Sequence, residues 1–167
     1  QYLERLAKKG EYVPSVALGG GFTFEDQIFK GLALGAPYAK AVAMARAPLA
    51  AAMVGKTIGR RIQEGMLPIY IERFGTRLEE IFVTAPELHQ KYGDRFKKIP
   101  PGALGLYTYF ERLVQGLRQF MCGARKFSLE HIARTDIAAL TRQAAEVSGI
   151  SYITEVDREE AEKILDS

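Results

Sequence analysis

The sequence contains a single cysteine, Cys122, among 167 residues. One thiol excludes an internal disulfide framework and suits a reducing compartment such as the cytoplasm. No apolar run approaches the roughly 20 residues that a helix needs to cross a bilayer, so no membrane partner is expected. Basic residues occur in pairs such as Lys8-Lys9 rather than in a stripe with interleaved aromatics, and the net charge is only +3. A nucleic-acid partner is therefore not expected.

Candidate catalytic and metal-binding groups are also scarce. His89 has no second ligand near it in the sequence, which favours an exposed, structural histidine over a metal site. His131 and the acidic residues of the C-terminal tail form no catalytic constellation. Cys122 falls in an apolar helical pattern and is expected to be a small buried residue. We therefore assign no catalytic residue and no metal ligand.

The stretch that organises the chain covers residues 16–49. The apolar run 16–18 predicts a buried parallel strand, which three consecutive glycines at 19–21 end abruptly. A capping threonine predicts a helix over residues 23–35, and a second apolar run, 38–43, predicts the next strand. A second turn and a long helix with proline in its first turn should follow. The pattern is thus strand, turn, helix, repeated.

Both turns lie where the carboxyl ends of parallel strands are expected. Gly19, Gly20 and Gly21 form the first turn, and Ala45 and Arg46 belong to the second. Glycine turns expose backbone N–H groups, and the helix that follows directs the positive end of its dipole to the same point. The three glycines alone favour a merely structural tight turn. With the second small-residue turn one strand later, the pattern favours a phosphate site between the two turns.

The same residues resemble a known family. Residues 20–36 read Gly-Gly-Phe-Thr-Phe-Glu-Asp-Gln-Ile-Phe-Lys-Gly-Leu-Ala-Leu-Gly-Ala and resemble the seventh-strand turn and helix of the FMN-binding domain of glutamate synthase. Residues 43–49, Ala-Met-Ala-Arg-Ala-Pro-Leu, resemble the second phosphate turn of that family, after its eighth strand. The similarity is greatest to the stand-alone FMN-binding members and continues more loosely into the helical tail.

The resemblance implies a fold. It predicts an α/β chain dominated by helix, namely strands 7 and 8 of a (β/α)8 TIM barrel and a helical tail. The barrel part would be residues 1–93, with residues 94–167 as a helical extension packed on it. The chain begins at Gln1, and the resemblance implies that the first six strands of the barrel are missing from it. Two strands cannot close a barrel, so we expect at most a short parallel pair near Val16 and Val42, covered by another copy in a homo-oligomer or rearranged.

The resemblance also implies a function. The parent protein would be a cytoplasmic FMN-dependent oxidoreductase of glutamate biosynthesis, acting on 2-oxoglutarate, glutamate, and glutamine or ammonia. In it, N–H groups of Gly20, Gly21, Ala45 and Arg46 would hold the FMN phosphate. Residues that act on substrate come from earlier strands in the family, so the piece alone is expected to be inactive and to bind FMN weakly.

One departure from the classical family concerns iron and sulfur. Those members carry three cysteines where this chain has Lys56-Thr-Ile-Gly-Arg-Arg-Ile-Gln-Glu-Gly65. Cluster ligation needs several thiolates close together, so no iron–sulfur cluster is expected, and the electron donor stays open. Two other readings also stay open: a fragment of another phosphate-binding TIM barrel, such as one for a nucleotide monophosphate, and a helical interaction module with a purely structural glycine turn.

Helical patterns dominate the remaining chain. The strongest helix is predicted over residues 103–124, after a loop at 94–105, and a further helix is predicted over 135–149. Thr84 is expected to cap a helix by its side chain. Gly55 and Gly59, four residues apart in the long helix after the second turn, predict either close backbone packing or simple weak points of that helix.

Overall fold

The computed structural model describes residues 2–166. Within them two short strands, β1 (Val16–Gly19) and β2 (Ala39–Ala43), pair in parallel and are joined by α2 (Glu25–Gly35). The other α-helices are α1 (Tyr2–Lys8), α3 (Arg46–Glu64), α4 (Ile69–Glu72), α5 (Leu78–Ile81), α6 (Ala85–Tyr92), α7 (Pro101–Gly123), α8 (Arg142–Ser148) and α9 (Arg158–Leu165). The 3-10 helices are η1 (Gly93–Lys98), η2 (Leu129–His131), η3 (Arg134–Asp136) and η4 (Ile153–Glu155). The expected dominance of helix, with a short parallel strand pair, is confirmed.

The assignment to a (β/α)8 TIM barrel is wrong. β1 and β2 have only four and five residues, and in the described part of the chain they make a sheet of two strands. A barrel needs every strand edge paired, whereas each strand here has one free edge. Most of the buried apolar side chains instead come from helices. The fold is therefore helix-dominated α/β without barrel closure.

The described chain divides into two compact units. The first comprises residues 2–20, 26–43 and 119–166, and the second comprises residues 21–25 and 44–118. The first holds both strands, and the second holds α3 to α6 with most of α7. Between residues 2 and 166, the helices are too short or too polar for any of them to cross a bilayer. The expected division after residue 93 stays a prediction.

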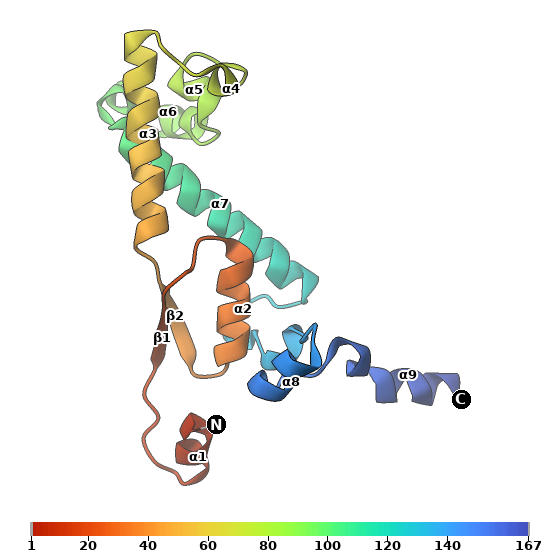
Figure 1. Ribbon diagram of the computed structural model, residues 1–167. Helices are drawn as coiled ribbons and strands as arrows, with labels where there is room; N and C mark the ends of the chain where they lie inside the picture. The colour runs from red at the N-terminus through yellow and green to blue at the C-terminus, as the bar shows by residue number, and fades with distance from the viewer. Residues whose placement is uncertain (1, 167) are drawn as a thin grey trace. The chain divides into compact units, whose positions relative to one another are not determined.

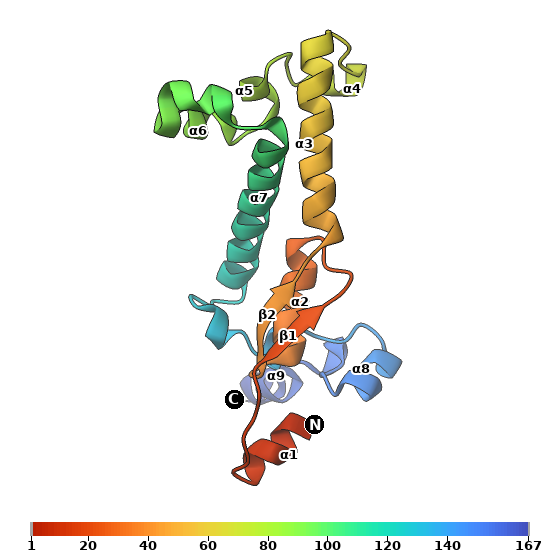
Figure 2. The same ribbon diagram turned by 90° about the vertical axis from the view of Figure 1, so that its left-hand side faces the viewer.

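In the first unit, α2 lies along one face of the strand pair (Figure 1 and Figure 2). Its buried residues are Phe29 and Ala33, four apart on one helical face, as the sequence predicts. Gly35 ends the helix at a point with no room for a side chain, because a Cβ there would lie 2.6 Å from the Cβ of Ala39 at the start of β2. Leu18 of β1 approaches the same point, 3.6 Å from that Cβ position. Glycine thus lets the end of α2 lie close to the start of β2, with a three-residue turn between them.

The second unit has the larger apolar core. Its centre is Leu104 of α7, which is 1% exposed. The other buried members of this cluster are Ile58, Phe82, Ala85, Leu88 and Phe96. They come from α3, from the end of α5, from α6 and from η1. The core therefore joins the two long helices to the short helical segments between them.

Two features near this core differ from the expectations. The Thr84 side chain does not cap α6; its hydroxyl lies 2.7 Å from that of Thr108, which donates to the Leu104 carbonyl at 2.9 Å. A buried hydroxyl needs such a partner, and Thr108 of α7 provides it. The loop predicted over 94–105 is also mostly helical, because η1 fills its first part and α7 begins at Pro101. Proline is tolerated in the first turn of a helix.

The two long helices of the second unit cross at glycines. A Cβ on Gly55 of α3 would lie 2.5 Å from the Pro101 carbonyl oxygen and 3.0 Å from the Gly105 Cα of α7. A Cβ on Gly59 would lie 2.4 Å from the Pro101 side chain. Of the two readings of Gly55 and Gly59, close backbone packing is confirmed. Figure 1 shows this crossing between α3 and the N-terminal half of α7.

In the first unit, Arg134 links the C-terminal ends of two helices. Its Nη1 donates to the Leu34 carbonyl of α2 at 2.9 Å, and its Nη2 donates to the Ser148 carbonyl of α8. Both acceptors lie in last turns, where carbonyls lack helical partners and the dipole favours a cation. We expect Arg134→Ala to lower the free energy of unfolding by about 1.5 kcal/mol, measured by urea denaturation. Arg158→Ala, which breaks only the exposed pair with Glu162, should cost about 0.5 kcal/mol; equal losses would contradict the linking role of Arg134.

Candidate phosphate-binding site

The two strand ends lie side by side in the first unit. Gly19, the last residue of β1, pairs with Ala43, the last residue of β2. A Cβ on Gly19 would lie 3.9 Å from the Cβ of Ala43, which is an ordinary contact. Because the strands are parallel, the two following segments leave the sheet from neighbouring points. This is the arrangement that the sequence predicts for paired turns at strand ends.

The first turn has a backbone that favours glycine. Gly20 has φ +104° and Gly21 has φ +77°, values that L side chains rarely adopt. No described atom lies within 4 Å of a Cβ built on either residue, and both residues are exposed. The turn therefore presents main-chain atoms at an open surface, where an anion can approach closely.

The second turn ends at an uncapped helix. Ala45 is the N-cap of α3 and its side chain makes no capping hydrogen bond. Its carbonyl accepts the N–H of Leu49 at 3.2 Å, so the helix ladder begins here. The first N–H groups of a helix have no intrahelical acceptor, and the first turn of α3 contains no acidic residue. Arg46, the first helical residue, is exposed and adds a positive charge to the positive end of the dipole.

The five predicted residues are divided between the units. Gly19 and Gly20 belong to the first, whereas Gly21, Ala45 and Arg46 belong to the second. Gly20 and Gly21 are joined by a peptide bond, and Ala45 follows the end of β2 by two residues. Each half of the predicted site thus has the local backbone that anion binding needs.

The segment after the glycine turn is held by α7 within the second unit. The Tyr109 hydroxyl donates to the Thr23 carbonyl at 2.5 Å, across 86 positions of sequence. Burial raises the pKa of the Tyr109 phenol, and the nearby negative charge of Glu25 raises it further. The phenol therefore stays protonated at neutral pH and can donate this bond. Glu25 itself lies against Gly116 of α7, where a Cβ would meet the Glu25 Cγ at 2.4 Å.

These α7 contacts are absent from the sequence-based prediction. The strongest sequence signal for them is Gly116, a glycine inside a helix whose apolar pattern is otherwise regular. A glycine in such a position weakens the helix and often marks a close approach by another part of the chain. Tyr109 and Glu25 carry no comparable signal, because their partners are distant in sequence.

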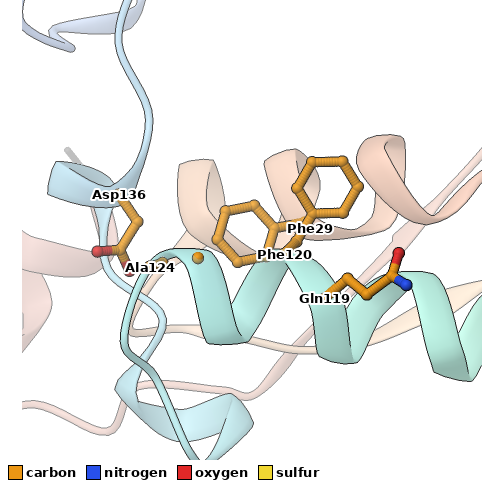
Figure 3. A pocket seen from close by; sticks show the side chains of 6 residues that line it. Phe29, Gln119, Phe120, Ala124 and Asp136 are labelled. Atoms are coloured by element: carbon orange, nitrogen blue, oxygen red, sulfur yellow. The ribbon is translucent and has the colours of Figure 1, made fainter.

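A separate pocket lies in the first unit, with a volume of about 470 Å³. It is lined by Phe29, Gln119, Phe120, Gly123, Ala124 and Asp136 (Figure 3). The Phe29 and Phe120 rings are stacked at 5.7 Å between centroids. The Asp136 carboxylate is already engaged, since it accepts the Ala133 N–H at 2.8 Å and lies 3.4 Å from the Lys126 Nζ. The wall is otherwise apolar or amide, and this composition indicates no chemistry.

His89 and Cys122 do not belong to the predicted phosphate site. His89 is exposed, as predicted, and stacks on Phe96 at 5.2 Å. Cys122 is exposed, so its predicted burial is wrong. Among residues 2–166, no group of three His, Cys, Asp or Glu side chains is placed to hold a metal ion.

Comparison of the chain with models of protein families, with curated proteins and with solved structures finds no match.

Proposed function

We propose that this chain contributes the FMN phosphate-binding loops of an oxidoreductase similar to glutamate synthase. The observation that supports this most is the pairing of Gly19 with Ala43, which sets two anion-suited turns at neighbouring strand ends. One turn has two glycines with positive φ, and the other leads into a helix start that no side chain caps. The resemblance of residues 20–36 and 43–49 to the FMN-binding domain gives the anion its proposed identity.

The residues present fit the phosphate end of FMN. The backbone N–H groups of Gly20, Gly21, Ala45 and Arg46 would hold its oxygens, in the way that helix starts and glycine turns bind phosphate elsewhere. A side chain at Gly20 would occupy the open space that an anion needs. FMN, when bound, supplies the ability to accept and pass on electrons. Groups that act on 2-oxoglutarate, glutamate, glutamine or ammonia would come from outside this chain, as the resemblance implies.

Compartment and assembly belong to the same proposal. An exposed single thiol, Cys122, is compatible with the reducing cytoplasm. Each strand of the parallel pair has one free edge, and parallel sheets are normally covered on both faces. We therefore propose that the strand pair is covered by another polypeptide, a second copy in a homo-oligomer being the simplest case.

The phosphate assignment predicts where FMN perturbs the chain. Amide NMR spectra are recorded with FMN up to about 1 mM, a concentration that detects a binding free energy of about 4 kcal/mol. The N–H signals of Gly20, Gly21, Ala45 and Arg46 should shift most. Riboflavin, which lacks the phosphate, should leave them in place. Shifts of these signals with AMP equal to those with FMN would indicate a general phosphate site, and no shift with FMN would contradict the proposal.

Gly20→Val should raise the dissociation constant for FMN about tenfold, because the added side chain fills the space for the anion. Positive φ also strains the valine, so a control with valine at another glycine of positive φ is needed. Gly10→Val provides it, since Gly10 has φ +71°, has no described atom within 4 Å of its Cβ position and lies outside the turns. FMN affinity equal in the two variants would show that the glycine turn does not hold the phosphate.

A further inference from the structure

The segment that runs from the glycine turn to the first residue of α2 has its own support. Residues 21–25 belong to the second unit together with α7. Thr23, two residues after Gly21, offers its carbonyl to the half-buried Tyr109 hydroxyl at 2.5 Å. This is a main-chain acceptor, so the bond fixes the path of the backbone rather than the position of a side chain.

A second contact lies two residues further on. A Cβ on Gly116 would lie 2.4 Å from the Glu25 Cγ, 2.7 Å from its Cδ and 2.8 Å from its Oε1. Gly116 is buried, and only the missing side chain leaves room for the carboxyl group. The Glu25 Oε2 is itself buried and has no hydrogen-bond donor among residues 2–166. The absence of a side chain at Gly116 thus provides the room in which the Glu25 carboxyl group lies.

The glycine turn is thus bounded on both sides. Before it, Gly19 is paired with Ala43 in the sheet. After it, Thr23 and Glu25 are held by α7. Gly20 and Gly21 have wide conformational freedom, and ordering them on binding costs free energy unless their flanks are already fixed.

We propose that Tyr109 and Gly116 of α7 are positioning residues for the glycine turn, which they order so that its N–H groups meet a phosphate. The inference rests on the proposed FMN function, and it assigns to the helical part of the chain a role in binding the cofactor. Neither residue touches the phosphate; they act through Thr23 and Glu25. The ligand class is a flavin or other small molecule that ends in a phosphomonoester.

The test compares FMN with riboflavin, because the phosphate is the part of FMN that distinguishes them. Tyr109→Phe removes only the hydroxyl and should weaken FMN binding about fivefold, the effect of one lost hydrogen bond. Gly116→Ala should act in the same direction by displacing Glu25, while alanine favours the helix itself. Neither variant should change riboflavin affinity. The affinity ratio, which is the dissociation constant of riboflavin divided by that of FMN, should therefore fall. A merely structural role would change both affinities together.

Two control variants lie on the same helix. Tyr107→Phe removes a hydroxyl from a side chain that packs on the core cluster, and Gly123→Ala adds a methyl group where no described atom lies within 4 Å. Both should leave the affinity ratio unchanged. Hydrogen exchange of the amides at 22–25 is measured in parallel and should accelerate in Tyr109→Phe and Gly116→Ala only.

The outcomes separate the two proposals. If the unsubstituted chain prefers FMN to riboflavin and both α7 variants keep that preference within twofold, the positioning role is overturned while the FMN function stands. If the unsubstituted chain shows no preference for FMN, the proposed function fails and the positioning of a phosphate turn fails with it. Exchange at 22–25 then still decides whether α7 orders this segment.

Discussion

Gly55→Ala is expected to lower the free energy of unfolding by about 2 kcal/mol, because the methyl group overpacks the crossing of α3 and α7. The Cβ would lie 2.5 Å from the Pro101 carbonyl oxygen and 3.0 Å from the Gly105 Cα, and both are backbone atoms that cannot rotate away. The contact is reciprocal, since a Cβ on Gly105 would lie 2.8 Å from the Ala51 carbonyl oxygen. In a chain of this length the loss corresponds to a fall in Tm of about 4–8 °C.

The sign of this change decides between packing and helix propensity. Alanine stabilises a helix interior by about 1 kcal/mol over glycine, so a glycine that is only a weak point would give a more stable variant. Gly123→Ala is the matched control, because no described atom lies within 4 Å of a Cβ there. It should be neutral or slightly stabilising. Thermal and urea unfolding of the two variants measure both effects, and a rise in stability of Gly55→Ala would contradict the close crossing.

Local sequence signals were sufficient for the parts of the fold that local physics determines. The run at 16–18 and the glycines at 19–21 predict β1 and its turn, because an apolar segment bounded by glycine has few other stable forms. The long helices α3 and α7 follow from apolar periodicity. The local backbone of the candidate site follows from the same signals. Its support by α7 does not, because Tyr109 and Thr23 are 86 positions apart.

Where the prediction is wrong, a non-local contact is the usual cause. A continuous helix was expected over 135–149, but η3 and α8 are separated there by an extended stretch. Ala139 lies in that stretch and pairs with the chain near Tyr152: its N–H donates to the Ser151 carbonyl and its carbonyl accepts the Ile153 N–H, each at 2.9 Å. Apolar periodicity carries no information about such a bridge, since it does not show which other segment of the chain will pair with Ala139.

The burial of α7 shows the same limit. Two of its large apolar side chains, Phe110 and Phe120, are 43% and 42% exposed. The buried residues of the helix are Leu104, Gly105, Leu113 and Gly116, so two of the four are glycines. Hydrophobicity scales favour large side chains and give glycine little weight, whereas close helix contacts select glycine because backbones then approach directly. Periodicity therefore predicted the helix, and its contact face required the structure.

Leu104→Ala is expected to lower the free energy of unfolding by about 3 kcal/mol. Leu104 is 1% exposed and lies at the centre of the core cluster that joins α3, α6 and α7. Its removal leaves a cavity that Ile58 and Phe82 cannot fill without shifting the helices that carry them. The Thr84–Thr108 hydrogen-bonded pair lies directly beside it, because Thr108 donates to the Leu104 carbonyl at 2.9 Å.

The comparison for Leu104→Ala is a leucine on the surface of the same unit. Leu49 of α3 is 63% exposed, so Leu49→Ala should change the free energy of unfolding by about 0.5 kcal/mol or less. Urea denaturation followed by circular dichroism measures both variants, with the slope of the transition compared to show that the same surface is exposed. Because α3 and α7 share this core, the loss of stability in the double variant Gly55→Ala/Leu104→Ala should differ measurably from the sum of the two single losses. Equal stability of the two leucine variants would mean that the core that contains Leu104 does not hold α7. A helix that is not held in place could not position the glycine turn.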